Sequence, residues 1–505
     1  MQTIRQFFST DFTPYFFQEK QEKNKSNVLF YVLFLSIFFA LKTNFHECWK
    51  DEWQAWFVAR DMSWSEMLGF LYYEGHPSLW YIYLKVITGI KSSFLPFLSD
   101  EIVLQSAHFA LFAAFSYWIL FKMNFSNIVK YALLFGFYFG FEYGMVNRGY
   151  ILVLLLTFMA ATFIQKDDTK IWKLALTLLL LCQTEAQGVI VACGLLLYLL
   201  LKKYFSEGIK NTIQNIDIQL LIGSIVLGIG LFVATIFPRG YAEDLARAYN
   251  SNQKGIGESM TIAFQGLLAN TFWIGAIDNT NVFGISILGI GLSILLATGL
   301  VYFFKEKRNL LLTFLLTFLA FYVFAAFIFV GGVRQWGILL VFFFALFFIG
   351  QKENLKINGI KLLIVSSILA FQCYYNGLAW YKEIQYPFSN AKACATFLNE
   401  QKIPSKVPIV AINPFETGVL NGYLDRNLYA LPKGETFTYF RWLEKVYLPS
   451  EAELRLFSDY KKVNGIVIVT NNQLPVQRYP NLQLWKKFDD YSIKGENFWV
   501  YTLKK

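Results

Sequence analysis

Charged side chains are scarce in this sequence. Asp, Glu, Lys and Arg make up 16% of its 505 residues, whereas hydrophobic residues make up 55% and aromatic residues 19%. This composition is too apolar for an ordinary soluble enzyme and predicts a polytopic α-helical membrane protein. The net charge of +10 is concentrated in short segments between apolar runs, where basic residues indicate membrane orientation. It therefore gives little support to nucleic-acid binding, and no nucleic-acid partner is predicted.

Cysteine is also rare, and its spacing argues against a metal centre built from cysteine pairs. The five cysteines show no metal-ligand spacing, and their number is odd. Cys182, Cys193 and Cys373 fall in or at the ends of apolar runs, which is typical of small core residues. Cys48 and Cys394 are both predicted to lie outside the membrane, which leaves a disulfide between them open. The sequence also lacks an internal repeat and a low-complexity linker.

Apolar runs of membrane-spanning length recur along the first three quarters of the chain. A span needs about 20 mainly apolar residues to cross the hydrocarbon core. The first run follows a polar tail without a small-residue cleavage site, so we expect it to be retained as a span and not removed as a signal peptide. We predict eleven spans, at 27–43, 102–121, 128–146, 149–165, 171–184, 187–202, 217–237, 283–304, 309–331, 335–350 and 358–376.

Basic residues are distributed unequally among the segments that join these spans. They concentrate in every second segment, at 1–26, 122–130, 166–173, 202–210, 305–308 and 352–361. In the short segments on the other side, the only basic residues are Arg148 and Arg334. Because Lys and Arg in short loops stay in the cytoplasm, the N-terminus is predicted to be cytoplasmic. Eleven spans then place the C-terminus outside.

The composition changes after residue 376. The short β-branched or aromatic runs at 406–412, 465–470 and 498–503 predict strands. The segments 389–402 and 450–462 have helical periodicity, and Ser450 with Glu453 matches a capping box. Alternating strands and helices predict a soluble extracytoplasmic α/β domain at 377–505, following a transmembrane domain at 1–376.

The long first outer loop, residues 44–101, is assigned to the transmembrane domain and has three helical segments. Four aromatic residues recur at three- and four-residue spacing in the first segment: Trp49, Trp53, Trp56 and Phe57. Ser63 and Glu66 match a second capping box, and Pro77 is suited to open a third helix. Since indole and phenyl rings favour the membrane boundary, these helices are expected to lie flat on the outer surface.

Acidic residues in this loop resemble a known family. Asp51 and Glu52 follow the first span directly, and the element Glu74-Gly75-His76-Pro77 follows about twenty residues later. This arrangement, with many spans and an external α/β tail, resembles the GT-C glycosyltransferases. It is similar in plan to the protein O-mannosyltransferases and the lipid A aminoarabinose transferases, which use polyprenyl-phosphate sugars. The segments EYGMVNRGY (142–150) and GGVRQWG (331–337) add to the likeness.

The resemblance implies an inverting transfer of a sugar from a polyprenyl-phosphate donor to an acceptor hydroxyl, in a bacterial-type inner or plasma membrane. In the family, the aspartate of the first outer loop is the base, which corresponds to Asp51, and Glu52 is its catalytic neighbour. Negative charge develops on the leaving phosphate, and arginines can stabilise it. The expected substrate-binding residues are Glu74, His76, Arg148, Tyr150, Arg239 and Arg334.

Each of these residues also has a purely structural interpretation. Asp51 and Glu52 suit the first turn of any helix, and Glu74 and His76 could cap the helix that follows Pro77. Glu142 could pair with Arg148, Arg334 could anchor a helix end, and Glu185 could satisfy local backbone groups. No cofactor is firmly implied. A divalent metal on Asp51, Glu52, Glu74 and His76 stays open but is not favoured, and no metal site is predicted.

Other functions remain open from the sequence. A lipid-linked oligosaccharide ligase or polymerase would share the fold, a secondary transporter would use polar residues within spans, and a scaffold would use the outer domain for a partner. The ionisable residues crowd toward the outer ends of the spans, which favours the enzyme over the transporter. The sugar is not identified, and the acceptor could be a protein, a glycolipid or a cell-wall glycan. Membrane lipids are the expected surroundings.

Overall fold

A computed structural model describes residues 2–18, 25–166, 170–237, 255–274, 287–441, 447–475 and 477–504. The chain forms two compact units, each built from separate stretches of sequence. The first unit comprises residues 1–40, 75–80 and 108–380, and the second comprises residues 41–74, 81–107 and 381–505. The second unit therefore combines most of the first outer loop with the C-terminal tail, which the sequence had assigned to different domains.

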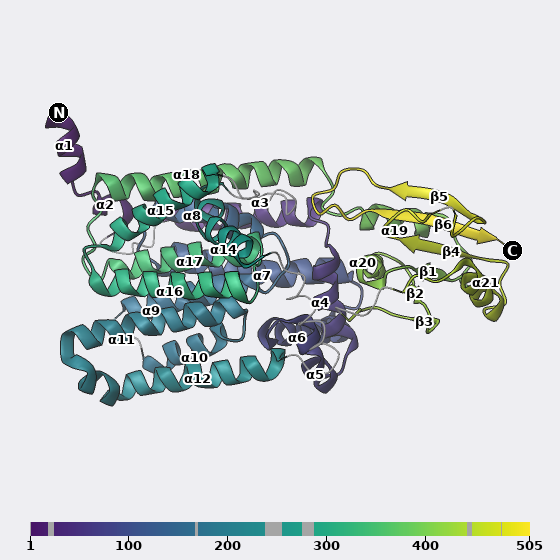
Figure 1. The fold of residues 1–505 in the computed structure, drawn as a ribbon, viewed down its shortest axis with the longest axis horizontal. Coiled ribbons are helices and arrows are strands. Elements are labelled where there is room, and N and C mark those ends of the chain that lie inside the picture. Colours follow the sequence, from purple (N-terminus) through teal and green to yellow (C-terminus); the bar gives the residue numbers. More distant parts are fainter. Residues whose placement is uncertain are drawn as a thin grey trace. The chain divides into compact units, whose positions relative to one another are not determined.

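Helices make up the first unit (Figure 1). Those that lie entirely within it are α1 (Gln2–Ser9), α2 (Thr13–Phe16), α8 (Asn127–Leu134), the π-helical η1 (Phe137–Glu142), α9 (Tyr150–Gln165), α10 (Ile171–Leu181), α11 (Ala186–Gln214), α12 (Ile216–Ile236), α14 (Ile256–Gln265), the π-helical η2 (Gly266–Ile274), α15 (Ile287–Phe304), α16 (Arg308–Phe327) and α17 (Val333–Gly350). Among the described elements, the helices that contribute residues to both units are α3 (Lys25–Phe45), α6 (Ser78–Phe94), α7 (Asp100–Lys122) and α18 (Gly359–Gln385).

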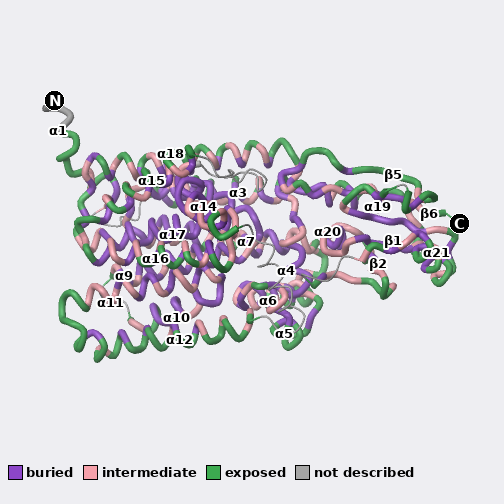
Figure 2. Tube along the Cα trace, viewed as in Figure 1, coloured by how far each residue is buried: buried purple, intermediate pink, exposed green. Residues whose placement is uncertain are grey.

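Among the described residues, eight helices are long and apolar enough to cross a membrane: α3, α7, α11, α12, α15, α16, α17 and α18. Helices α9 and α10 are apolar but shorter. The protein is therefore an integral membrane protein, and the predicted total of eleven spans is not confirmed. Helix α17 forms the core of the first unit (Figure 2), since 94% of its 18 residues are buried. Helices α9, α11 and α16 pack against it.

The predicted span 128–146 is not one continuous helix. Helix α8 ends at Leu134, and Gly136 has an extended backbone, with φ −75° and ψ 146°, before η1 begins. A Cβ atom on Gly140 would lie 2.5 Å from the carbonyl oxygen of Leu134. This close approach of backbone to backbone requires glycine, and it shows how the chain passes from an α-helical to a π-helical segment without a side chain in the way.

The second unit contains the predicted loop helices α4 (Lys50–Asp61) and α5 (Trp64–Glu74), and the predicted third helix is α6. The Ser63 amide donates to Glu66 Oε2 at 2.8 Å, and the Glu66 amide donates to Ser63 Oγ at 3.3 Å, as the capping box requires. The aromatic stripe of α4 is not at a lipid boundary, however. Trp53 is fully buried, where its ring packs against Tyr423 and the backbone of Gly422. The expectation that the stripe lies on the membrane surface is wrong, because the tail covers it.

The tail folds around a mixed sheet of order β3-β2-β1-β4-β6-β5. The central strand β1 runs parallel to β2 and β4, and β6 runs antiparallel to β4 and β5. The bounds are β1 Ile409–Ala411, β2 Tyr429–Ala430, β3 Glu435–Thr436, β4 Gly465–Thr470, β5 Leu482–Phe488 and β6 Phe498–Lys504, with helices α19 (Ala391–Glu400), α20 (Pro414–Thr417) and α21 (Glu451–Tyr460) and the 3₁₀ helix η4 (Gly418–Gly422). No disulfide joins Cys48 and Cys394, so the bridge left open by the sequence is not present.

Candidate functional site

In the first unit, the N-terminal ends of α9, α11 and α17 come together. The side chain of Gln335, in the first turn of α17, donates from Nε2 to the hydroxyl oxygen of Tyr150, the first residue of α9, at 2.8 Å. Glu185 is the N-cap residue of α11 and is joined to the segment before α9 through His76 and Arg148. Helix N-termini carry partial positive charge, so their convergence favours an anion at this end of the unit.

His76 links an arginine to a carboxylate. Its Nδ1 lies 2.9 Å from Glu185 Oε2, and its Nε2 lies 2.9 Å from Arg148 Nη2. A guanidinium has no acceptor atom, so Nε2 must accept the proton that Arg148 donates. The remaining ring proton is then on Nδ1, from which it is donated to Glu185. This geometry specifies the neutral tautomer of His76 and fixes the orientation of the Arg148 side chain.

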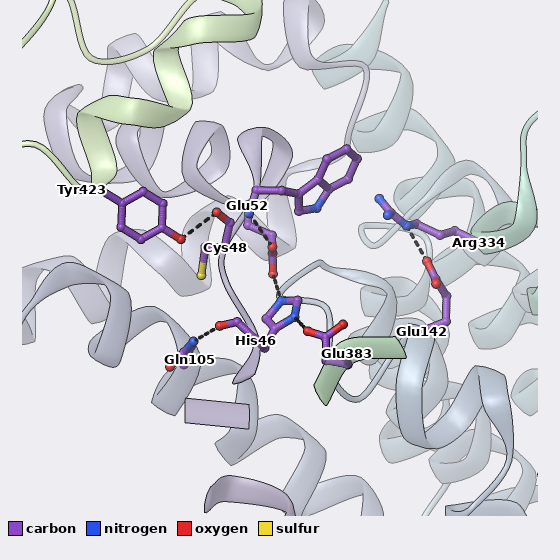
Figure 3. Close-up of polar contacts among 9 residues, drawn as sticks. His46, Cys48, Glu52, Gln105, Glu142, Arg334, Glu383 and Tyr423 are labelled. Carbon is purple, nitrogen blue, oxygen red and sulfur yellow. Dashed lines mark hydrogen bonds and ion pairs between the residues drawn. The ribbon is translucent and has the colours of Figure 1, made fainter. Parts of the chain in front are cut away.

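A second arginine lies on the first turn of α17. Arg334 Nε donates to Glu142 Oε1 at 2.5 Å, and the two side chains are 10% and 8% exposed (Figure 3). Glu142 therefore pairs with Arg334 from a distant part of the sequence. The Tyr143 hydroxyl donates to the carbonyl oxygen of Arg334 at 2.6 Å. The Tyr143 ring stacks on the Tyr150 ring, with the ring centroids 5.7 Å apart. Tyr150 lies close enough to both arginines to interact electrostatically with each, so the two arginine clusters are neighbours and are together termed the arginine network.

The structure thus brings together four residues that the sequence selected: His76, Arg148, Tyr150 and Arg334. Glu142, Glu185 and Gln335 complete the network. Gly337 allows Tyr138 and Tyr143 to approach α17. A Cβ atom at this position would lie 2.2 Å from the Tyr138 ring and 2.5 Å from the Tyr143 hydroxyl. Arg239, the remaining predicted phosphate-binding residue, lies outside the described residues.

In the second unit, a buried histidine lies between two carboxylates (Figure 3). His46 Nε2 is 3.0 Å from Glu52 Oε1, and His46 Nδ1 is 2.7 Å from Glu383 Oε1; all three side chains are fully buried. Burial opposes protonation, but the two carboxylates outweigh it and raise the pKa of His46 to about 9. His46 is therefore an imidazolium at neutral pH and donates to both acids. The sequence analysis missed it.

Glu52 has a second contact that fixes the start of α4. Its Oε2 accepts the backbone N–H of Trp49 at 3.0 Å, and Gln105 Nε2 donates to the carbonyl oxygen of His46 at 2.8 Å. Glu52 is thus fully buried in structural contacts, while the adjacent Asp51 is only partly buried. Of this acidic pair, Asp51 is the one that solvent reaches.

Glu74 is also held by structural contacts. Its two carboxylate oxygens accept from Gln54 Nε2 at 2.7 Å and from the Tyr81 hydroxyl at 2.9 Å. Gln54 also accepts the backbone N–H of Phe440 at 3.1 Å and donates to its carbonyl oxygen at 2.7 Å. Glu74 therefore connects α5 and α6 to α4, whose Gln54 side chain is hydrogen-bonded to the backbone of Phe440 in the tail. Within the described residues, no group of three or more His, Cys, Asp or Glu side chains is arranged to hold a metal ion.

Comparisons with known proteins give a fold. No protein-family model matches the sequence, and no curated protein sequence is significantly similar to it. The crystal structure of apo ArnT from Cupriavidus metallidurans is similar, with a TM-score of 0.50 and 11% identity over 94% of this chain and 97% of that one. The structure of the same protein bound to undecaprenyl phosphate has a TM-score of 0.46 at the same identity and coverage.

ArnT is a lipid A aminoarabinose transferase of the GT-C type. At 11% identity the likeness concerns the arrangement of the chain and not its substrates. It confirms the fold that the resemblance implied, from the helical membrane part to the small C-terminal sheet domain. The protein has the fold of the GT-C membrane glycosyltransferases.

Proposed function

We propose that this protein transfers a sugar from a polyprenyl-phosphate donor to an acceptor hydroxyl, with inversion at the anomeric carbon. The observation that carries the proposal is the convergence of three helix N-termini, those of α9, α11 and α17, with Arg148 and Arg334 beside them. Helix N-termini and guanidinium groups both suit a phosphate, the first through backbone N–H groups and the helix dipole and the second through bidentate hydrogen bonds.

The charge of this network suits a group that gains negative charge during the reaction. Two arginines face two carboxylates, Glu142 and Glu185, so the resting network is close to neutral. A donor phosphodiester carries one negative charge, and the lipid phosphate that leaves carries more. Cations already fixed in position stabilise that added charge without reorganising, which lowers the barrier to bond breaking. Arg148 is held for this purpose by His76, and Arg334 by Glu142.

Asp51 is the proposed base. Its carboxylate takes the proton of the acceptor hydroxyl as the acceptor oxygen bonds to the anomeric carbon, and the bond from that carbon to the phosphate oxygen breaks. The bonding electrons leave with the polyprenyl phosphate, and a single displacement inverts the configuration. Glu52, fully buried with His46, supports the helix that carries Asp51.

The proposed orientation has the N-terminus in the cytoplasm and the C-terminal sheet domain outside. It rests on the concentration of Lys and Arg in alternate connecting segments. The acceptor is then a hydroxyl on the outer side of the membrane. The donor is the polyprenyl-phosphate sugar itself, and no further cofactor is needed for the displacement.

The test is complementation of a deletion strain, read by mass spectrometry of envelope glycolipids and glycoproteins. The wild-type gene should restore one missing sugar, and Asp51→Asn should not, although it reaches the membrane in equal amount. Asp61→Asn is the matched control, because Asp61 is a partly exposed acid at the other end of α4. Restoration by Asp51→Asn would remove Asp51 from the role of base.

A further inference from the structure

The second unit contains a polar cavity of about 320 Å³ beside the start of α4. Two indole rings line it, those of Trp49 and Trp499, together with Lys50 from the first turn of α4. This volume is at the lower end of the range for sites that bind small molecules, which suits a ligand the size of a single sugar ring.

The cavity lies where the topology of the sheet favours a ligand. Strands β1 and β4 are parallel neighbours, while the chain leaves β1 to form β2 on the opposite side. In open α/β sheets, ligands bind outside the carboxyl ends of the strands at such a switch point. Glu416 follows β1, and Asn471 and Asn472 follow β4 directly; all three line the cavity. Trp499 enters from β6, where it is opposite Thr470 of β4.

The side chains around the cavity suit a polyhydroxylated ligand. Asparagine side chains offer both donors and acceptors to hydroxyl groups, and three of them line the wall, Asn471, Asn472 and Asn497. An indole ring supplies a flat apolar face with a polar edge, which matches the C–H face of a pyranose ring. Trp499 is only partly buried, whereas Trp49 is 7% exposed and has Lys494 Nζ 4.9 Å from its ring centroid, so Trp499 is the indole that a sugar would contact. A phosphate site would need neither indole, and an apolar ligand would leave the amides unsatisfied.

The charges of the wall balance. Lys50 Nζ is 2.7 Å from both carboxylate oxygens of Glu416. Lys494 and Glu496 provide the second pair of opposite charges in the wall. Burial raises the pKa of Glu496 to about 7, against the opposing effects of its hydrogen bond from Ser389 and of nearby Lys50. The cavity thus has no strong excess of either sign, which favours an uncharged ligand over a phosphate or an ammonium.

We propose that this cavity binds an uncharged sugar ring of the acceptor, so that the acceptor is a glycan or a glycolipid. The inference rests on the proposed function, because the cavity adjoins the proposed base. Lys50 lines the cavity and Asp51 is the next residue, close enough to act electrostatically on Glu496 in the wall. A sugar held against the Trp499 indole would present a hydroxyl near Asp51, with the rest of the acceptor extending into solvent.

Direct binding to the full-length protein in nanodiscs tests the proposal. The probes are methyl glucoside, methyl mannoside and N-acetylglucosamine, with glucose 6-phosphate as the charged comparison, and the readout is saturation-transfer NMR together with tryptophan fluorescence. We expect at least one neutral sugar to bind saturably, and to bind more tightly than the phosphate. Binding of none of the three neutral sugars, or tighter binding of the phosphate, would overturn the proposal.

Variants locate the binding. Trp499→Ala should weaken the sugar about tenfold or more, and Asn472→Phe should block the cavity without removing a packed side chain, since Asn472 is exposed. Trp485→Ala is the matched control, because Trp485 is on the neighbouring strand β5 and does not line the cavity. Sugar binding that survives both cavity variants would place the ligand elsewhere and refute the assignment.

The two proposals fail separately. If Asp51→Asn keeps full transfer while Asn472→Phe abolishes sugar binding, the base is wrong and the cavity is right. If Asp51→Asn abolishes transfer while Asn472→Phe leaves sugar binding and the acceptor KM unchanged, the glycosyltransferase proposal stands and the acceptor site is wrong.

Discussion

Variants of the buried pair Arg334 and Glu142 can distinguish a structural role of the arginine from a role in binding the donor. The two side chains are 10% and 8% exposed, and their contact is 2.5 Å. Arg334→Gln leaves the Glu142 carboxylate buried without this partner, which costs about 3–5 kcal/mol for a buried pair. The double variant Arg334→Gln/Glu142→Gln removes both charges. Glutamine has nearly the shape of glutamate but is shorter than arginine, so most of that stability should return, apart from the packing lost at position 334.

The donor KM should respond differently from the stability. A hydrogen bond from a charged group contributes about 1.5–3 kcal/mol, which corresponds to roughly 10- to 150-fold in binding. If Arg334 binds the donor phosphate, the double variant regains thermal stability while its donor KM stays higher by that factor. If Arg334 only holds Glu142 in place, stability and donor use recover together.

The assay combines two measurements on the same preparations. Unfolding midpoints come from intrinsic fluorescence of the purified protein, and donor KM comes from the rate of sugar transfer in membranes supplied with increasing polyprenyl-phosphate sugar. Glu142→Gln alone keeps the arginine and is the control for loss of the carboxylate. A double variant with wild-type donor KM would refute the phosphate assignment of Arg334.

Three further predictions concern single side chains. Because the pKa of His46 is raised from 6.5 to about 9, its contribution to stability is complete below about pH 6.5 and is lost as the pH rises through 9. Up to roughly 3 kcal/mol of the free energy of unfolding should disappear by pH 10. The unfolding midpoint of His46→Gln should not show that decline. His76→Phe should raise the donor KM, since Arg148 loses the acceptor that orients it; an unchanged donor KM would contradict this. Gly337→Ala should lower the unfolding midpoint by overpacking two tyrosines, whereas Gly291→Ala, where a Cβ atom meets nothing within 4 Å, should not.

Local patterns in the sequence predicted local structure well. The capping boxes at Ser63 and Ser450 mark the starts of α5 and α21, and both reciprocal contacts are present. Strand β4 was predicted with its exact bounds because GIVIVT is β-branched and its interior is buried. Strand β5 was missed, since LQLWKKF is an edge strand whose residues are mainly exposed, so it lacks the buried alternation that identifies a strand.

Contacts between distant residues limited the prediction of the site. His46 has its partners at Glu52 and Glu383, and the second of these is 337 residues away, so its charge could not be inferred from its neighbours. Glu142 was matched with nearby Arg148 from sequence proximity, yet its partner in the structure is Arg334. The sequence did select the arginines themselves, because they stand alone in short connecting turns.

The most direct test of the phosphate site is native mass spectrometry of the purified protein with equal amounts of undecaprenyl phosphate and undecaprenol. These lipids differ only in the phosphate, so any preference reports its recognition. The account predicts that the wild-type protein retains the phosphate form, and that the preference disappears when Arg148 and Arg334 are both replaced by alanine. Equal retention of the two lipids by the wild-type protein, or an undiminished preference in the double variant, would contradict it.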